Sequence, residues 1–253
     1  MEHDGQAAVH QGREGVIMEP AKRDYSLIGR DGRQAIETGL ASAKWYHTDI
    51  PRKQMKALMQ RSDQPAIRDT SVWLGLMAAF AAAAVALWPS LWSVPFLLAY
   101  GVLYGSASDS RWHECSHGTA FRTQWMNNAV YQIASFMIMR NPVTWRWSHA
   151  RHHTDTLIVG RDPEIVAMRP PDLMRIALNF VGILDSIRAM KTMVMNAFGS
   201  LDAEEATFVT ESEQPKVFRV ARIWLAIYLA TTAVAVLTGS ILPLLLVGLP
   251  RLY

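Results

Sequence analysis

Two long stretches of the chain carry no charged side chain and are strongly apolar. The first covers residues 71–108, and Pro89-Ser90 divides it into two arms, 71–88 and 91–108. Each arm is about long enough to cross ~30 Å of hydrocarbon at ~1.5 Å per residue. Two tryptophans flank the break, Trp88 and Trp92. The pattern predicts two antiparallel membrane helices with interfacial anchors at the turn. The alternative is a buried hairpin in a soluble core, where uncharged runs of this length are rare.

The second uncharged stretch covers residues 223–250. Residues 223–238 predict one more crossing, and Gly239-Ser240 predicts a turn, with Pro243 just beyond it. The remaining residues, 241–253, have the pattern of a return helix that begins and then stops short. The alternative is a single long tilted helix.

Between these stretches, residues 173–198 mix Ile, Leu, Val, Met and Phe with charged side chains. The charged residues include Arg175, Asp185, Arg188 and Lys191. We expect an amphipathic helix that lies in the membrane interface or packs against a cytosolic domain, and the pattern leaves both open. Residues 44–69 are basic and partly helical in pattern, which places them at the surface near the headgroups.

The charge distribution gives an orientation. The basic residues around the first apolar stretch are Arg52, Lys53, Lys56, Arg61 and Arg68 before it and Arg111, Arg122, Arg140, Arg146 and Arg151 after it. The tip at Pro89 carries no charge, so the positive-inside rule places the N-terminus and residues 109–222 in the cytosol. The sequence therefore predicts an all-α integral membrane protein, of a bacterial inner membrane, with membrane-embedded helical hairpins and a cytosolic helical cap.

We divide the chain into a mobile tail and cytosolic lead-in, residues 1–44, and one domain over residues 45–253. Within that domain we expect a membrane hairpin at 71–108, a cytosolic region at 109–222 and an incomplete second membrane segment at 223–253.

Composition narrows the possibilities further. Half of the 253 residues are hydrophobic, yet the mean hydropathy is only +0.06, so a large polar portion accompanies the membrane portion. A net charge of only +3, without runs of basic residues, argues against a nucleic-acid-binding surface. Cys115 is the single cysteine, which excludes an internal disulfide and suits a reducing compartment. Residues 1–20 are polar and contain no apolar signal-peptide core.

Candidate chemistry lies in two histidine clusters, which hold five of the eight histidines. These five are His113 and His117, directly after the first apolar stretch, and His149, His152 and His153. Spacings of i, i+4 and i, i+3, i+4 place each group on one helical face. Gathering so many imidazoles without a metal would cost desolvation or mutual repulsion, and a bound metal removes that cost. We predict that all five are metal ligands, with Asp109 and Glu114 as candidates to orient them.

A rival interpretation starts from His113-Glu114-x-x-His117, which matches the H-E-x-x-H signature of zinc peptidases. The extended form of that signature needs Gly and His further along, where this chain has Ala120 and Thr123. It also leaves the second cluster unexplained, whereas five or more nitrogen ligands suggest two metal ions and suit iron and oxygen chemistry.

The order of a hairpin, the segment RWHECSHGTAF, then NPVTWRWSHARHHTDT and GRDPE, resembles the membrane fatty acyl desaturase and hydroxylase superfamily. The resemblance covers residues 45–253. It implies two iron ions that activate O2 and remove hydrogen from an unactivated C–H bond of a membrane lipid or acyl substrate. Electrons would come from a separate ferredoxin-, rubredoxin- or cytochrome-type donor.

The chain departs from that family in one respect. Members carry a third H-x-x-H-H box after a second membrane hairpin, whereas no histidine follows His153 here. The resemblance therefore predicts a chain truncated before the third box, with at best part of the metal site. The remaining histidines, His3, His10 and His47, are expected to be exposed rather than ligands.

Several residues near the clusters receive structural interpretations. We expect Cys115 to be a small buried thiol and the tryptophans Trp112, Trp145 and Trp147 to pack at the headgroup level. Asp162 and Glu164 either brace the loop after the second cluster or simply form a turn.

For the function of the protein, fatty acyl desaturation is the first prediction. Lipid or alkyl hydroxylation, a membrane zinc peptidase and an inactive remnant are the alternatives.

Overall fold

The computed structural model describes residues 23–44, 46–108, 110–165, 168–179 and 182–252, and within these ranges the chain contains helices and no strand. The α-helices are α1 Arg30–Glu37, α2 Arg52–Leu58, α3 Gln64–Leu87, α4 Val94–Gly105, α5 Ser110–Ser116, α6 Gln124–Met137, α7 Pro142–Asp155, α8 Leu173–Asn179, α9 Ile183–Ala197, α10 Gln214–Thr238 and α11 Leu242–Leu246. Short 3-10 helices are η1 Leu40–Ser42, η2 Leu91–Ser93, η3 Ser106–Ser108, η4 Glu205–Thr207 and η5 Leu249–Leu252. The all-α prediction is confirmed.

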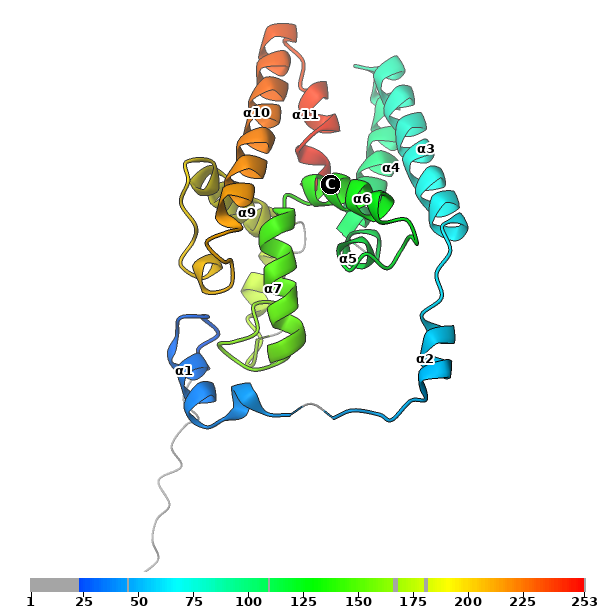
Figure 1. Cartoon of the computed structure of the whole chain (residues 1–253). Coiled ribbons are helices and arrows are strands. Elements are labelled where there is room, and N and C mark those ends of the chain that lie inside the picture. The colour runs from blue at the N-terminus through cyan, green and yellow to red at the C-terminus, as the bar shows by residue number, and fades with distance from the viewer. Residues whose placement is uncertain (1–22, 45, 109, 166–167, 180–181, 253) are drawn as a thin grey trace, which may run out of the picture.

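The first apolar stretch forms the expected hairpin, α3 against α4 (Figure 1). Helix α3 begins seven residues earlier than predicted, with Pro65 in its first turn, and its 24 residues span about 36 Å. Helix α4 itself has only 12 residues, about 18 Å, and η2 and η3 complete the predicted second arm, whose crossing of the membrane stays a prediction. Pro95 fixes the start of α4, and the flanking residues tighten into η2 and η3 instead of extending the α-helix.

The second apolar stretch turns back on itself. Helix α10 ends at Gly239, whose φ of +60° is the left-handed conformation in which glycine ends helices. Helix α11 then descends beside α10, and η5 reaches α4 (Figure 1). The predicted turn is therefore confirmed, and the single long helix was wrong. The hydroxyl of Tyr100 on α4 donates to the Leu246 carbonyl at 2.8 Å, which ties the two apolar units together.

The amphipathic segment 173–198 forms two helices, α8 and α9, rather than one. Helix α9 packs along α10 through a cluster that includes Met193, Trp224 and Tyr228. Both placements stay open, because α10 is itself one of the long apolar helices and apolar side chains of α8 and α9 such as Ile176 and Ile187 are exposed. Helix α2, in the basic segment before α3, is exposed throughout, as expected for a surface segment.

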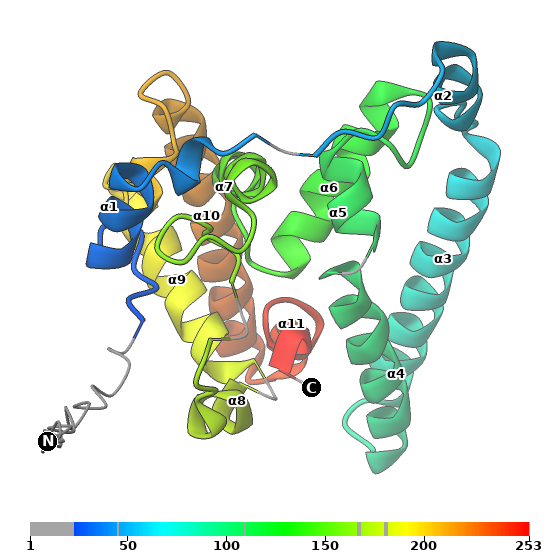
Figure 2. The same ribbon diagram turned by 90° about the horizontal axis from the view of Figure 1, so that it is seen from below.

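Helix α7 lies between two buried clusters, and this position places the histidines. The larger cluster joins α3, α4, α5, α6 and α7 through aromatic side chains such as Trp73, Tyr104 and Tyr131. The smaller one joins Met139, just before α7, to α9 and α10. Figure 2 shows α7 with α10 and α9 on one side and α5 and α6 on the other.

Candidate metal centre

Helix α7 has strong local reasons to begin where it does. The Asn141 side chain caps its N-terminus by accepting from the Val143 and Thr144 N–H groups, and Pro142 occupies the first turn. The buried Tyr131 hydroxyl on α6 donates to the Pro142 carbonyl at 2.6 Å. The Asn141 amide also donates to the Val217 carbonyl of α10. Because α7 is fixed at its start, its three histidines have a defined position.

Histidines from the two clusters converge, although they are about thirty residues apart in the chain. Ring nitrogens of His113, His117 and His149 all lie within 4.8 Å of one another. His117 Nε2 is 3.0 Å from His149 Nε2 and 3.3 Å from His153 Nε2, and the last two atoms are 3.1 Å apart. The His152 ring lies one step further out, with centroids 5.6 Å from His149 and 5.7 Å from His153. All five rings are therefore neighbours.

Two carboxylates from the loop after α7 hold the outer nitrogens of the second cluster. His149 Nδ1 lies 2.9 Å from a Glu164 oxygen, and His152 Nδ1 lies 2.9 Å and 3.0 Å from the two Asp162 oxygens. A carboxylate at Nδ1 favours a proton on that nitrogen, which leaves the lone pair on Nε2. In His149 that lone pair faces the Nε2 atoms of His117 and His153, the arrangement in which histidines bind a metal ion.

The loop that carries these carboxylates is itself well tied. The Asp162 side chain is buried and accepts from the backbone N–H groups of Leu157 and Glu164, each at 2.8 Å. Asp155, at the end of α7, pairs with Arg161 at 2.9 Å. The Asp162 carboxylate therefore does two tasks, because it closes the loop and orients His152.

Two tryptophans form a buried floor under the histidines. Trp145 stacks on His149 with ring centroids 4.2 Å apart, and Trp112 lies 3.8 Å from Trp145. The Trp112 indole N–H donates to the Ser135 hydroxyl at 3.0 Å. Their expected place at the headgroup level was wrong for both, because the packing of α5 and α7 on α6 buries them. Trp147, on the other side of α7, is exposed.

Burial and crowding favour the neutral form of two of the histidines, His117 and His149. Burial, together with the neighbouring His113, His153 and His152, lowers the pKa of His149 to about 4. Burial, together with the neighbouring His149, His113 and His153, also lowers the pKa of His117. Neutral imidazole is the metal-binding form, so the donor set fits a cation. Burial, with the Glu114 charge as a second cause, raises the pKa of the Cys115 thiol to about 11, and the prediction of a buried thiol is confirmed.

Of the two residues predicted to orient the histidines of the first cluster, the structure describes one. Asp109 lies outside the described residues, as do His3 and His10. Glu114 is exposed, and its role stays a prediction. His47 is exposed, as expected. The carboxylates that contact the histidines are Asp162 and Glu164, which the sequence marked only as loop braces. They lie in the loop after α7 and not on the helix itself, so helical periodicity could not identify them as partners of the histidines.

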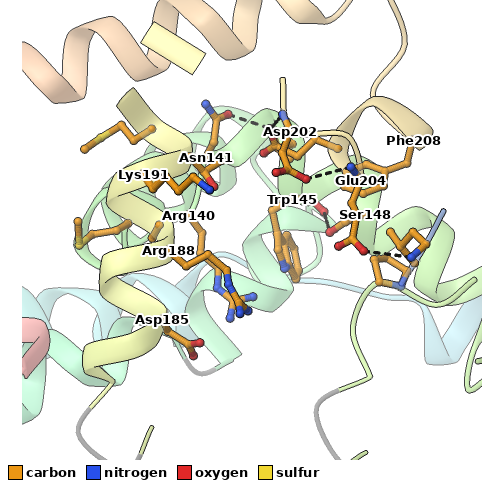
Figure 3. A pocket seen from close by; sticks show the side chains of 18 of the residues that line it. Arg140, Asn141, Trp145, Ser148, Asp185, Arg188, Lys191, Asp202, Glu204 and Phe208 are labelled. Carbon is orange, nitrogen blue, oxygen red and sulfur yellow. Dashed lines mark hydrogen bonds between the residues drawn. The ribbon is translucent and has the colours of Figure 1, made fainter. Parts of the chain in front are cut away.

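A cavity of about 750 Å³ lies beside α7 (Figure 3). Its wall includes Trp145, Ser148 and Asp162, so it borders the site directly. Figure 3 shows Arg140, Arg188 and Asp185 gathered at one end and Asp202 and Glu204 at the other. Residues 25–27, from the segment before α1, also line it.

Comparison with known proteins agrees with this geometry. The sequence model of the family "Fatty acid desaturase" matches residues 86–253, which include both histidine clusters. The match covers more than half of the chain. The chain therefore belongs to the fatty acid desaturase family, as its resemblance indicated.

Two plant proteins are similar over a shorter stretch. The chain is 28% identical over 86 residues to "Omega-6 fatty acid desaturase, endoplasmic reticulum" of Brassica juncea, and 28% identical over 89 residues to "Delta(12)-acyl-lipid-desaturase" of Punica granatum. The alignments cover 34% and 35% of this chain and 21% of each relative, so the chain spans about a fifth of the length of the curated relatives it matches. No solved structure gives a significant match.

Proposed function

We propose that the chain is an O2-dependent iron protein of the membrane that desaturates fatty acyl chains. The observation that carries this proposal is the convergence of His117, His149 and His153 Nε2 atoms within 3.3 Å of one another. Family membership supplies the reaction class, and it favours lipid oxidation over the peptide hydrolysis that H-E-x-x-H alone would allow.

The residues to hold iron are His113, His117, His149, His152 and His153, with Asp162 and Glu164 orienting two of them. Bound iron would supply the redox chemistry by which O2 oxidises an unactivated C–H bond. Two such ions are proposed on the basis of the ligand number. The chain's own contribution is to present neutral imidazoles, to fix their tautomers and to exclude water with the Trp112–Trp145 floor.

The apolar helices support a membrane setting. Of the most apolar stretch of each long helix, only 17% in α3 and 22% in α10 is buried. A core helix of a soluble protein would be mostly buried, whereas lipid would cover these exposed apolar faces. The positive-inside rule then supports a cytosolic position for the histidines. There a ferredoxin-, rubredoxin- or cytochrome-type donor could deliver electrons.

The stoichiometry of the reaction determines what the assay must supply and measure. Desaturation removes two hydrogen atoms from adjacent carbons, and with two electrons and two protons from the donor side it reduces O2 to two waters. The chain is reconstituted in lipid vesicles with Fe(II), a ferredoxin-type donor and O2, and the acyl chains are analysed by mass spectrometry. We expect bound iron and a product two hydrogens lighter, both absent from a His149→Ala control. A product with one added oxygen would support the hydroxylase alternative. Retention of no iron beyond that of the control would overturn the proposal.

A further inference from the structure

The segment before the first hairpin reaches back to the loop that carries Asp162 and Glu164. Helix α1 lies beside the loop at the lower end of α7 in Figure 1, and Figure 2 shows the same proximity from below. This helix lies outside residues 86–253, the part that the family match covers. The family match therefore says nothing about its position.

The contact between the two is made by backbone against backbone. Gly32 of α1 is buried, and a Cβ added there would lie 2.3 Å from the Gly160 carbonyl oxygen. Conversely, a Cβ added to Gly160 would lie 2.4 Å from the Gly32 nitrogen. Gly160 also has φ of +74°, which only glycine adopts without strain. Neither position accepts a larger residue unless the helix and the loop move apart.

Two further hydrogen bonds attach the same segment to other loops around the cavity. The Arg169 N–H donates to the Tyr25 hydroxyl at 2.8 Å, and the Leu27 N–H donates to a Glu204 oxygen at 3.1 Å. Tyr25, Ser26 and Leu27 form part of the cavity wall. The segment is thus attached at three separate places around α7.

Gly160 lies in the part of that loop whose position determines where the two carboxylates lie. It is two residues before Asp162 and four before Glu164, the two carboxylates that contact His152 and His149. Asp162 reaches back to the Leu157 N–H, so Gly160 lies inside the turn that this bond closes. A shift of Gly160 must therefore move the carboxylates or break that bond.

We infer that residues 23–37 are a positioning element for the second histidine cluster, in which Gly32 against Gly160 sets the place of Asp162 and Glu164. Gly32 is a positioning residue: it touches no histidine and acts through the loop. The effect on metal binding rests on the proposed function, whereas the effect on the loop itself does not.

The test is Gly32→Ala in the full chain, with Gly75→Ala as the matched control. Both replace a helical glycine by alanine, but an added Cβ at Gly75 meets nothing within 4 Å. Alanine has the higher intrinsic helix propensity, so a loss in Gly32→Ala cannot come from α1 itself. We expect faster hydrogen exchange in residues 155–164 of Gly32→Ala and wild-type exchange in α3 and α4, which shows that the rest of the fold is intact.

Metal binding is followed separately with Co(II), whose ligand-field absorption reports ligand geometry. We expect about tenfold weaker Co(II) binding and an altered spectrum in Gly32→Ala, as for loss of an orienting partner. Gly75→Ala should match the wild type in both measurements. Wild-type exchange in residues 155–164 of Gly32→Ala would overturn the inference, as would faster exchange with unchanged Co(II) binding and spectrum. If the wild type bound no Co(II), the proposed function would fail, while the exchange experiment would still decide whether α1 holds the loop.

Discussion

The two histidine clusters face the same centre, but the protein supports them very differently. His149 and His152 stand on a capped 14-residue helix, and each has a carboxylate on its outer nitrogen. His113 lies on the seven-residue helix α5 and His117 directly follows it, and both side chains are exposed. The second cluster is therefore prearranged by the fold, whereas the first has fewer restraints from the residues that the structure describes.

This difference suggests a division of roles in metal binding. Rigid ligands lower the entropy cost of binding, and flexible ligands adapt to the ion once it is present. We expect the second cluster to determine affinity and the first to complete the coordination. The following variants test this contrast, in order of decreasing effect.

The largest loss is expected for His149→Ala. This substitution removes the central imidazole and leaves the Glu164 carboxylate without its histidine partner. We expect iron affinity to fall by at least ~100-fold, the upper end of what even outer partners of a metal site contribute. Iron content after dialysis against a graded chelator measures it. His47→Ala, at an exposed histidine, is the control and should bind like the wild type. Equal losses of iron affinity in both variants would show that His149 is not an iron ligand.

Asp162→Asn should have the next largest effect. The amide keeps the shape of the side chain but cannot match the carboxylate that faces His152 and two backbone N–H groups. We expect iron affinity to fall ~10- to 100-fold, and the free energy of unfolding to fall by about 1–3 kcal/mol. Chelator competition and thermal unfolding give the two values. Unchanged iron binding would show that the second cluster does not depend on its carboxylates.

Tyr131→Phe tests the hydrogen bond that fixes the start of α7 rather than the histidines that α7 carries. The substitution removes the buried hydrogen bond to the Pro142 carbonyl and keeps the ring in the core. We expect a loss of about 1 kcal/mol in the free energy of unfolding. Iron affinity should change less than in Asp162→Asn. If Tyr131→Phe weakened iron binding as much as Asp162→Asn, rigidity of the whole helix rather than the carboxylates would be decisive.

The smallest effect is expected for Glu114→Gln in the first cluster. Glu114 is exposed, so an uncharged isostere should change iron affinity by less than about twofold, in contrast to a buried orienting carboxylate. Product formation in the vesicle assay should continue. Zinc in place of iron, together with peptide hydrolysis that Glu114→Gln abolishes, would instead establish the peptidase alternative.

The sequence predicted the elements better than their lengths, and the grouping of the histidines better than the carboxylates that contact them. Uncharged stretches marked α3 and α10 because a long apolar helix is visible in the composition of the chain. Pro95 inside the second arm was visible, but the 3-10 turns that shorten α4 depend on its packing. Helical spacing brought each histidine group onto one face, yet only the tertiary fold could bring the two groups together.

Trp112 and Trp145 illustrate the same limit. Tryptophan near an apolar helix usually marks a membrane interface, so composition suggested headgroup contact. Their burial depends on where α6 lies, which no local pattern gives. Asp162 and Glu164 were likewise visible as acidic loop residues, but their contacts with His152 and His149 depend on how the loop after α7 folds back.

The hydrogen bond between Tyr100 and Leu246 has a consequence for how the chain is made. Its two partners are 146 residues apart, so the first hairpin leaves the ribosome long before the segment it contacts. At about 5–20 residues per second, roughly 7–30 s of synthesis separate them. During that delay the face of the hairpin that carries Tyr100 lacks its final neighbour. The first apolar unit is therefore made before the histidine region and the second after it, so this bond between the two units can form only once residue 246 has been synthesised.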